Sequence, residues 1–557
     1  MEFAELIKTT RVDNVILRRQ SSSLVEGTLC LTSHHLIFSS RVSEKDELML
    51  LYMAIEDVQK KIAGYNGTIN IICKDFTSFK LRIPGAENCL NVAASIEALS
   101  TLENQTWYYP FFHRLDFIIT ENGWDAFSPE VELKNLIDGS DSWRICSLNN
   151  EFKISLSYPE LNIVPKAVTD DLILKSSYFR FEGRFPILAF LNRKNKVPLL
   201  RSSQPQPGHQ GKRCKEDEKF LSTILQGHSK KGFIFDTRSR SVISAHKSKG
   251  GGSESESKYP QWKRVILGID QYISLPDSIG KLHAACADKK TGAWLSNLES
   301  SGWLTTVEAV LTAAVKIAEQ IDTHDTPVLV HEDNGMDITL VLTSLVQILL
   351  NPESRTIRGL QSLIVREWLW AGHPFASRNM KLGVSLARYK GQGSVFLLFL
   401  DTLHQIISQY PSSFEYGEDL LCFLSFHSYA SPYGTFLFNN ESERKREKVS
   451  SKTISVWSYL NQPKILQSFV NPLYEYNDGP LWPSVAPPSL NIWSLMFLKW
   501  AVSSTPRKKV QDQAVKMKEQ NTKLKEQAYQ LQREYLELQK EIVAIFGGEN
   551  DEKHLSE

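Results

Sequence analysis

Cysteine is scarce in this chain of 557 residues, and its seven cysteines are scattered along the sequence. None of them stands in a Cys-x-x-Cys pair. This spacing excludes the usual zinc knuckles and the disulfide frameworks of small secreted domains. The odd number and the scatter favour a reducing compartment.

Long hydrophobic runs and a surplus of charge are also missing. The longest apolar stretches, 338–350 and 395–400, are too short to span a bilayer. Lys and Arg number 64 against 63 Asp and Glu, which excludes the basic surplus of a typical nucleic-acid-binding protein. The opening segment 1–7 is too acidic for a signal or transit peptide. We therefore expect a cytoplasmic protein with no nucleic-acid partner and with only peripheral association to endomembranes.

Aromatic and other apolar residues are plentiful. Apolar residues make up 42% of the chain, with 12 Trp and 27 Phe. This content favours deep, packed cores over a disordered chain, and the length allows more than one domain.

The first 105 residues have the pattern of a small β-rich module. Alternating apolar and polar residues predict strands at 27–32, 35–38, 68–73 and 79–83. The apolar spacing within 91–99 predicts a helix that closes one end of this module.

From about residue 110 to 505 the pattern changes to long helices and short buried strands. The strand candidates are 197–200, 232–235 and 327–330. Two segments rich in Gly, Ser or Lys, 205–212 and 248–257, are predicted to be loops, the second of them exposed. This alternation predicts an α/β domain.

The segment 326–339 (TPVLVHEDNGMDIT) is the most informative part of this region. It predicts a buried strand, a short polar loop and then an apolar helix that runs to Leu350. Such a loop offers backbone N–H groups and a helix N-terminus to an anion. A phosphatase built this way needs a Cys nucleophile at the start of the loop and an Arg at its end. Here Glu332 and Ile338 occupy those two positions.

The C-terminal segment 508–546 contains no Gly or Pro and repeats every seven residues. One apolar row falls at heptad position d, and a second row falls at position a. The d row is Val510, Met517, Leu524, Leu531, Leu538 and Ile545, and the a row is Ala514, Asn521, Ala528, Tyr535 and Ile542. This pattern predicts a coiled-coil helix, and one such helix requires a partner to bury its stripe.

Several short segments together resemble one protein family. They are 201–205, 215–219, 235–238, 249–252, 354–359, 367–369 with 372–375, and 433–437. With the loop and the heptads, they are similar to the myotubularin family of phosphoinositide phosphatases over nearly the whole chain. The segments 1–9 and 440–444 resemble an inactive member of that family.

The resemblance implies an α+β and α/β multidomain fold. It places a pleckstrin-homology-like GRAM domain, a β-sandwich with a closing helix, at 1–105 and a linker at 106–125. A catalytically inactive α/β phosphatase domain of the dual-specificity type would follow at 126–505. The coiled coil at 508–546 and an acidic flexible tail at 547–557 would complete the chain.

At the loop, active members of the family carry His-Cys-Ser-Asp-Gly-Trp-Asp-Arg-Thr. In this chain His331, Gly335, Asp337 and Thr339 match that motif. The departures are Glu332 for the Cys, Asp333 for the Ser, Asn334 for the first Asp, Met336 for the Trp and Ile338 for the Arg. Since the residues that carry catalysis are absent, the catalytic roles do not transfer. We expect no enzyme activity and no cofactor.

Charge argues against Glu332 as a substitute nucleophile or base. The stretch 326–345 contains Glu332, Asp333 and Asp337, and no cation except His331. Each carboxylate about 4 Å from a phosphate charge repels it by roughly 4 kcal/mol at an effective dielectric near 20. A helix N-terminus returns only about 1–2 kcal/mol. Repulsion therefore exceeds attraction.

Less specific interpretations account for the other polar clusters. His331, Glu332, Asp333 and Asp337 lie too close along one loop to converge on a metal ion, so we expect no metal site. They are expected to be solvated or to cap the following helix, with Asp333 or Asn334 as the N-cap. The basic stretch 444–448 is expected to be a solvated face, with contact to anionic lipid as the alternative.

The expected function is that of an adaptor. The chain would pair through 508–546 with active myotubularin phosphatases, stabilise them, and raise their activity or targeting toward phosphatidylinositol 3-phosphate and 3,5-bisphosphate. Ala514, Ala528 and Asn521 weaken a self-paired seam, while Lys518 and Lys525 favour an acidic partner. This favours a hetero-oligomer, and a homodimer stays open.

Two alternatives to this pairing are also open. The helix could pack back on its own domain. The chain could instead bind phosphoinositide membranes by itself through the GRAM domain, whose basic residues show no recognisable cluster in the sequence.

Overall fold

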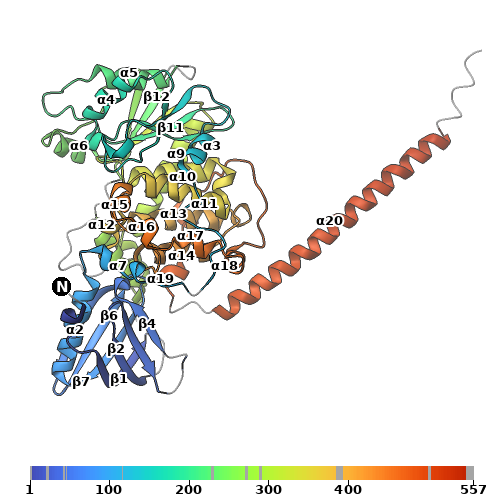
Figure 1. Cartoon of the computed structure of the whole chain (residues 1–557). Helices are drawn as coiled ribbons and strands as arrows, with labels where there is room; N and C mark the ends of the chain where they lie inside the picture. Colours follow the sequence, from blue (N-terminus) through green and yellow to red (C-terminus); the bar gives the residue numbers. More distant parts are fainter. Residues whose placement is uncertain are drawn as a thin grey trace, which may run out of the picture. The chain divides into compact units, whose positions relative to one another are not determined.

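The computed structural model describes residues 3–19, 24–41, 44, 47–115, 117–226, 231–269, 274–287, 292–383, 393–499 and 504–546 (Figure 1). The chain forms two compact units. The larger consists of residues 1–471 and 475–501, and the smaller of residues 472–474 and 502–557. None of the helices in the described ranges combines the length and apolar content that a bilayer crossing requires.

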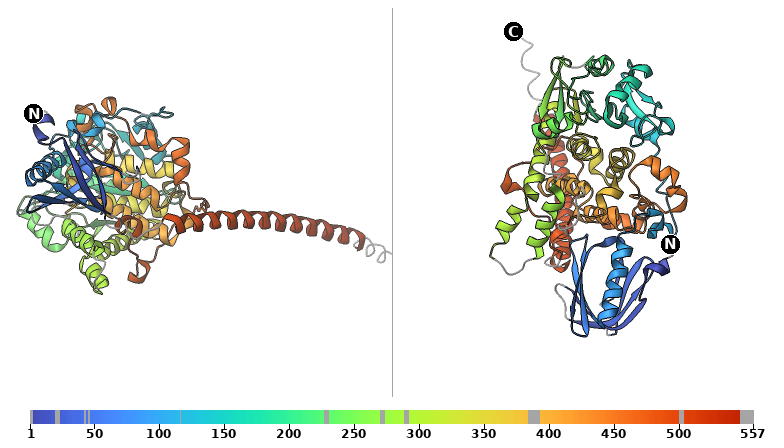
Figure 2. Two further views of the ribbon diagram at one scale, coloured as in Figure 1. Left: turned by 90° about the horizontal axis from the view of Figure 1, so that it is seen from below. Right: turned by 90° about the vertical axis from the view of Figure 1, so that its left-hand side faces the viewer.

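The N-terminal part of the larger unit is a seven-stranded antiparallel sheet in the order β4-β3-β2-β1-β7-β6-β5. Its strands are β1 (Arg11–Arg19), β2 (Val25–Leu31), β3 (His35–Ser40), β4 (Leu48–Leu51), β5 (Ile55–Ala63), β6 (Asn66–Cys73) and β7 (Ser78–Pro84). A short helix, α1 (Phe3–Leu6), precedes them, and α2 (Ala86–Ser100) packs on β5, β6 and β7 (Figure 2). The side chains of Val92, Ile96 and Leu99 on α2 are buried in this core. The predicted strands and closing helix of this module are confirmed.

The second sheet has five strands in the order β10-β11-β14-β12-β13. They are β10 (Ile187–Leu191), β11 (Pro198–Ser202), β12 (Gly232–Asp236), β13 (Trp262–Ile266) and β14 (Val328–His331). All neighbouring pairs are parallel except β10 with β11. The central strand β14 is buried along its whole length, as expected of a parallel strand covered on both faces. The three strands predicted for this region are confirmed. A separate pair of strands, β8 (Trp143–Cys146) and β9 (Asn162–Pro165), is antiparallel.

Helices make up most of the remaining regular secondary structure of the domain. They are α3 (Pro129–Leu136), α4 (Asp170–Phe179), α5 (Lys215–Ile224), α6 (Arg240–Lys247), α7 (Leu275–Ala287), α8 (Trp294–Ser300), α9 (Trp303–Asp322), α10 (Ile338–Leu350), α11 (Ile357–Ile364), α12 (Phe375–Asn379), α13 (Val395–Gln409), α14 (Glu418–Tyr429), α15 (Glu441–Arg446), α16 (Val449–Lys452), α17 (Val456–Leu460), α18 (Pro463–Phe469) and α19 (Ser494–Phe497).

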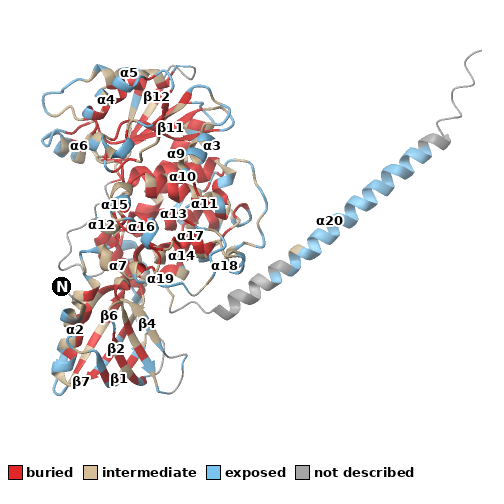
Figure 3. Ribbon diagram, viewed as in Figure 1, coloured by how far each residue is buried: buried red, intermediate tan, exposed pale blue. Residues whose placement is uncertain are grey.

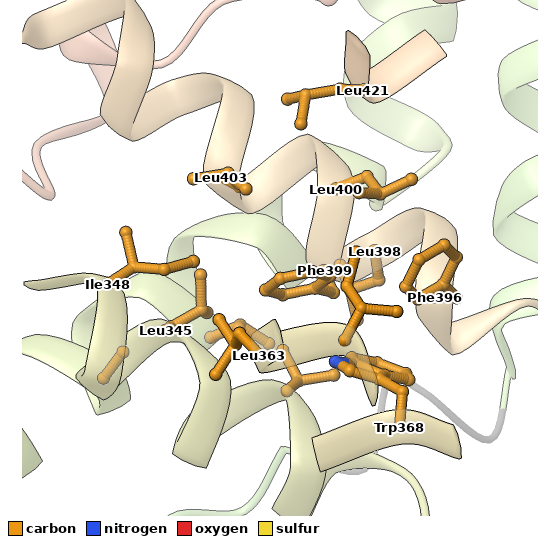
Figure 4. Close-up of a cluster of buried hydrophobic side chains, with 14 of the residues drawn as sticks. Leu345, Ile348, Leu363, Trp368, Phe396, Leu398, Phe399, Leu400, Leu403 and Leu421 are labelled. Atoms are coloured by element: carbon orange, nitrogen blue, oxygen red, sulfur yellow. The ribbon is translucent and has the colours of Figure 1, made fainter. Parts of the chain in front are cut away.

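Helix α10 is the centre of the largest core. Every one of its 13 residues is buried, since the helix packs against β11 and β14 and against α9 and α13. Leu345 and Ile348 of α10 lie near Leu363 of α11, with Phe399 of α13 beside them (Figure 4). A helix that is apolar on all sides needs this complete enclosure. The core therefore fixes the start of α10 relative to the sheet.

The prediction that the loop at 248–257 is exposed is wrong at its centre. Gly251 and Glu254 are buried there. A Cβ on Gly251 would come within 2.5 Å of the Gln204 side chain, so glycine lets the backbone pass close by. Glu254 is buried because it pairs with Arg180, at 2.7 Å. That partner lies 74 residues away, and local composition could not reveal it.

The basic stretch 444–448 is solvated at Lys445 and Arg446, as expected, but Arg444 is buried. The Arg444 guanidinium donates to the carbonyls of Leu437 and Leu369. Burial lowers the pKa of Arg444 to about 10. The expectation of a solvated face is therefore wrong at this residue, which holds loops together instead.

The smaller unit contains α20 (Ser504–Phe546), one unbroken helix of 43 residues. At 1.5 Å per residue it is about 65 Å long. The helix predicted over 508–546 is thus present. The side chains of Val510, Ala514 and Ile545, and the predicted tail at 547–557, lie outside the described part of the chain.

Candidate functional site

The loop at 331–338 lies at the carboxyl edge of the second sheet, as predicted. Strands β11, β14 and β12 are parallel, and their ends at Ser202, His331 and Asp236 are in register. The loop leaves β14 at His331 and enters α10 at Ile338. Open α/β sheets bind ligands at this edge, where strand ends and helix N-termini meet.

The carboxylate of Glu332 lies at the N-terminus of α10. Its Oε1 accepts a hydrogen bond from the backbone N–H of Asp337 at 2.6 Å. Its Oε2 accepts one from the N–H of Ile338 at 3.0 Å. The side chain is fully buried. Two N–H groups that a phosphatase loop would present to a phosphate are therefore bound by a carboxyl group of the chain itself.

Two more N–H groups of the loop are bound in the same way. The N–H of Asn334 donates to Asp333 Oδ1 at 2.8 Å, and that of Met336 donates to Asn334 Oδ1 at 2.9 Å. These are local turns rather than helix caps. The expectation that Asp333 or Asn334 caps α10 is wrong, because their short side chains bond within the loop. Glu332 reaches the first turn of α10 instead.

Glycine at position 335 preserves the shape of the loop. Its φ is +71°, and a Cβ there would lie 2.4 Å from the Ser202 carbonyl oxygen. Only glycine tolerates both conditions without strain. The phosphatase-type scaffold is thus retained although its chemistry has changed.

Cations from distant segments neutralise part of the loop. Arg378 donates to both carboxylate oxygens of Asp337, at 2.9 and 2.5 Å. Arg184 donates to the Gly335 carbonyl at 2.8 Å. His331, Glu332 and Asp337 are buried, so the expectation of solvated side chains is wrong for them, whereas the alternative of capping the following helix holds for Glu332. The segment 326–345 itself contains no arginine. Arg184 and Arg378 come from other parts of the sequence, so the charge of the segment alone could not include them.

Burial also shifts protonation around the loop. It raises the pKa of Glu332, and Asp337 and Asp333 act in the same direction, whereas the two N–H groups oppose the shift. Burial lowers the pKa of His373 to about 4. This neutral imidazole donates from Nδ1 to the Met336 carbonyl at 2.8 Å, because a carbonyl can only accept. His373 therefore brings no positive charge to the loop.

A buried ion network lies behind His331. Its Nε2 is 2.9 Å from Glu254 Oε2. Glu254 Oε1 accepts from Arg180 at 2.7 Å, and Arg180 also pairs with Asp217 at 2.7 Å. Sequence reasoning did not identify these partners as site residues. The sequence did contain a signal for one of them, because Asp217 lies in 215–219, one of the segments that carry the family resemblance.

The position that would hold a phosphate-clamping cation is apolar. Ile338 is fully buried among the core residues around α10. A cation at this position would have to enter that core at high cost. The loop thus has neither a thiol at position 332 nor a guanidinium at position 338. Among the described residues, no group of three His, Cys, Asp or Glu side chains could hold a metal ion.

Comparison with known proteins identifies the fold family. Residues 108–445 match the family described as Myotubularin-like phosphatase domain. This range covers more than half of the chain. The chain belongs to the myotubularin family. Residues 11–100 of this myotubularin chain also match the GRAM domain described for MTMR6-9. The predicted combination of a GRAM domain with a myotubularin phosphatase domain is confirmed.

Curated relatives extend this likeness to nearly the whole length. The chain is 48% identical to human Myotubularin-related protein 9 over 519 residues, which cover 93% of this chain and 94% of the relative. It is 38% identical to Myotubularin-related protein 9 of Caenorhabditis elegans over 518 residues, 90% of this chain and 91% of the relative. Mouse Phosphatidylinositol-3,5-bisphosphate 3-phosphatase MTMR2 is 32% identical over 506 residues, 88% of this chain and 76% of the relative. The resemblance to this family is therefore confirmed.

The second candidate site of this myotubularin chain is the heptad stripe of α20. The predicted seam side chains within the described part are all exposed (Figure 3). The large ones are Met517 (65% exposed), Leu524 (61%), Leu531 (65%), Tyr535 (64%), Leu538 (58%) and Ile542 (55%). The two smaller members, Asn521 and Ala528, are exposed as well.

Two further apolar residues widen this stripe. Tyr529 is 71% exposed and Leu536 is 50% exposed, and both follow an a position directly. They are seven residues apart, so the heptad repeat could have revealed them. The apolar surface is therefore broader in the C-terminal half of α20 than the two predicted rows.

Proposed function

We propose that this chain is a catalytically inactive regulatory subunit of active myotubularin phosphatases. It pairs with them through α20, stabilises them, and raises their activity or targeting toward phosphatidylinositol 3-phosphate and 3,5-bisphosphate. The observation that carries the proposal is the apolar row of Met517, Leu524, Leu531 and Leu538 on α20, whose side chains are exposed in the described part of the chain.

The loop geometry supports catalytic silence. A substrate phosphate would have to displace the Glu332 carboxylate from the N–H groups of Asp337 and Ile338. An ionised carboxylate that stayed within about 4 Å would repel the phosphate by roughly 4 kcal/mol at an effective dielectric near 20. Position 332 also lacks a thiolate to attack the phosphorus.

The energetics of α20 support a pairing role. Burying an exposed Leu or Met side chain contributes about 1.5–3 kcal/mol, so four such residues contribute roughly 6–12 kcal/mol. This is of the same order as the entropic cost of association, about 4–15 kcal/mol. The a positions must then add to the interface, and Asn521 and Ala528 add little in a self-paired helix.

Charge at the edge of the seam favours a different partner chain. In a parallel homodimer, Lys518 and Lys525 at position e would face Gln513 and Gln520 at position g of the second copy. Such contacts provide no ion pair. A partner with Glu or Asp at its g positions would provide two.

A co-purification experiment tests the proposal. The full-length chain is co-expressed with an active myotubularin phosphatase, beside a variant with Leu524→Glu and Leu531→Glu. Burying two glutamates in the seam should lower the affinity by more than 100-fold, because at least 3 kcal/mol of apolar burial is lost. We expect the variant to lose the partner and the increase in phosphatase rate together.

The matched control places glutamate one residue earlier in the same two heptads, with Lys523→Glu and Gln530→Glu. These exposed positions lie off the seam, so pairing should persist. If the seam variant retains the partner as well as the control does, α20 is not the means of assembly and the proposal is wrong.

A further inference from the structure

The register of the N-terminal sheet gathers four cations that lie far apart in the sequence. Arg18 of β1 is paired with Lys80 of β7, and Arg82 of β7 is paired with Ile16 of β1. Continuing across β6, Arg82 is opposite Thr68, which is opposite Lys61 of β5. Directly opposed residues lie on the same face of a sheet.

The two rows share one face, here called the basic face. The first row is Gln59, Asn70, Lys80 and Arg18, and the second is Lys61, Thr68, Arg82 and Ile16. Because Lys80 and Arg82 are two residues apart on one strand, both rows point away from the core. The core lies on the opposite side, with Leu81 and Ile83 fully buried.

All four cations of the basic face are exposed. Within the described part of the chain, none of Arg18, Lys61, Lys80 and Arg82 forms an ion pair or a side-chain hydrogen bond. Other cations of the domain differ: Arg11 pairs with Asp13, Arg41 with Glu26 and Lys60 with Glu97. Four cations that are not in ion pairs therefore gather on this face.

The carboxylates at the border leave that charge in place. Glu26 is opposite Ile16, but it is bound to Arg41 at 3.1 Å. Asp57 lies at the far end of β5 and accepts from Gln59 at 3.0 Å. Between them, the two rows contain four positive side chains and no acidic one. Neighbouring strands are about 4.8 Å apart, so the four charges lie within roughly one to two Debye lengths of each other in physiological salt.

We propose that the basic face is a docking surface for an anionic lipid bilayer, and that it responds to surface charge rather than to one headgroup. This goes beyond the proposed pairing through α20 and stands or fails separately. The sheet offers charges spread over several strands, with short polar side chains between them. A spread array matches many headgroups in a plane, whereas one phosphate would need donors that converge on a point.

Charge complementarity predicts the strength of this contact. Each Lys or Arg near an anionic membrane surface strengthens binding by about fivefold, so that removing two should weaken it by roughly 25-fold. Such an attachment is weak alone and is strengthened when a bound partner also contacts the membrane.

Vesicle sedimentation with the full-length chain tests this proposal. The vesicles contain phosphatidylcholine alone, phosphatidylcholine with phosphatidylserine, or phosphatidylcholine with a phosphoinositide at matched surface charge. The test variant carries Lys80→Gln and Arg82→Gln. The control carries Arg11→Gln and Lys60→Gln, which removes the same charge from the same domain but from residues already in ion pairs.

We expect the wild type to bind both anionic vesicles equally and to release them in high salt. The test variant should lose about 25-fold in affinity while the control loses less than about fivefold. Equal loss in the two variants would overturn the proposal, as would binding to phosphoinositide vesicles alone. Failure to bind either vesicle, with binding to polyglutamate or RNA instead, would assign the face to another class of partner.

Discussion

At the scale of single residues, the loop at 331–338 shows how one side chain occupies the N–H groups at the start of a helix. Glu332 stands where the family motif has a nucleophile, and it holds the N–H groups of Asp337 and Ile338. A carboxylate is planar and has two oxygens, so it accepts from two donors of the loop at once. Two donors that an external oxyanion would need are thus occupied within the chain.

Removing this carboxylate should reopen the loop to oxyanions. In Glu332→Ser the two buried N–H groups lose their acceptor, and the free energy of unfolding should fall by about 1–3 kcal/mol for each. Phosphate that binds the folded state should restore part of the loss, and the gain should rise with the logarithm of its concentration once that exceeds the Kd. Thermal unfolding with and without inorganic phosphate measures both effects.

The control for this variant is Glu319→Ser, an exposed position on α9. It should show neither the loss of stability nor the gain with phosphate. If phosphate stabilises the wild type as strongly as Glu332→Ser, the carboxylate does not block the loop.

Much of this site could be predicted from the sequence, because it depends on residue identity at known spacing. The strand, the loop, the helix and the missing Cys and Arg follow directly from 326–339. The partners of the loop could not be predicted. Arg184, Glu254 and Arg378 come from other elements, and only the fold brings them together.

At the scale of elements, local patterns predicted seven strands, namely β2, β3, β6, β7, β11, β12 and β14, and missed others such as β1 and β5. The pattern of a strand also does not state its register. The basic face illustrates this limit. Arg18 and Lys61 look isolated in the sequence, and only the pairing of β1, β7, β6 and β5 aligns them with Lys80 and Arg82. The heptad stripe of α20 could be predicted, because the spacing of residues along a helix alone determines which side chains share a face.

Within that stripe, Asn521 should limit self-association. A polar residue at position a lowers stability and restricts the choice of partner. Asn521→Leu should therefore strengthen self-pairing by more than about 100-fold, since each of the two copies adds roughly 1.5–3 kcal/mol of apolar burial. Sedimentation equilibrium of the full-length chain measures the dimer constant.

Gln530→Leu provides the comparison, because it adds the same side chain at an exposed position off the seam. It should leave the dimer constant within about twofold of the wild type. Equal self-association by both variants would indicate non-specific hydrophobic association and would contradict a specific role of Asn521.

At the scale of the whole molecule, buried polar contacts join the N-terminal sheet to the phosphatase-type domain. Glu56 of β5 accepts from the N–H groups of Leu382 and Gly383, at 2.9 and 2.8 Å. Lys74 donates to the Asn379 carbonyl at 2.8 Å, and burial lowers the pKa of Lys74 to about 8. Buried charged groups of this kind cost stability when a partner is removed.

These contacts should make the two domains unfold together, and Glu56→Ala should separate them. The change leaves two buried N–H groups without acceptors, which costs about 2–6 kcal/mol in total. It also removes the carboxylate that favours the charged form of Lys74. Because this loss falls on the contact between the domains, scanning calorimetry should show one transition dividing into two.

Glu97→Ala, an exposed position on α2 that pairs with Lys60, should keep a single transition. A single transition in Glu56→Ala, shifted no further than in Glu97→Ala, would mean that the domains are joined mainly by apolar contacts.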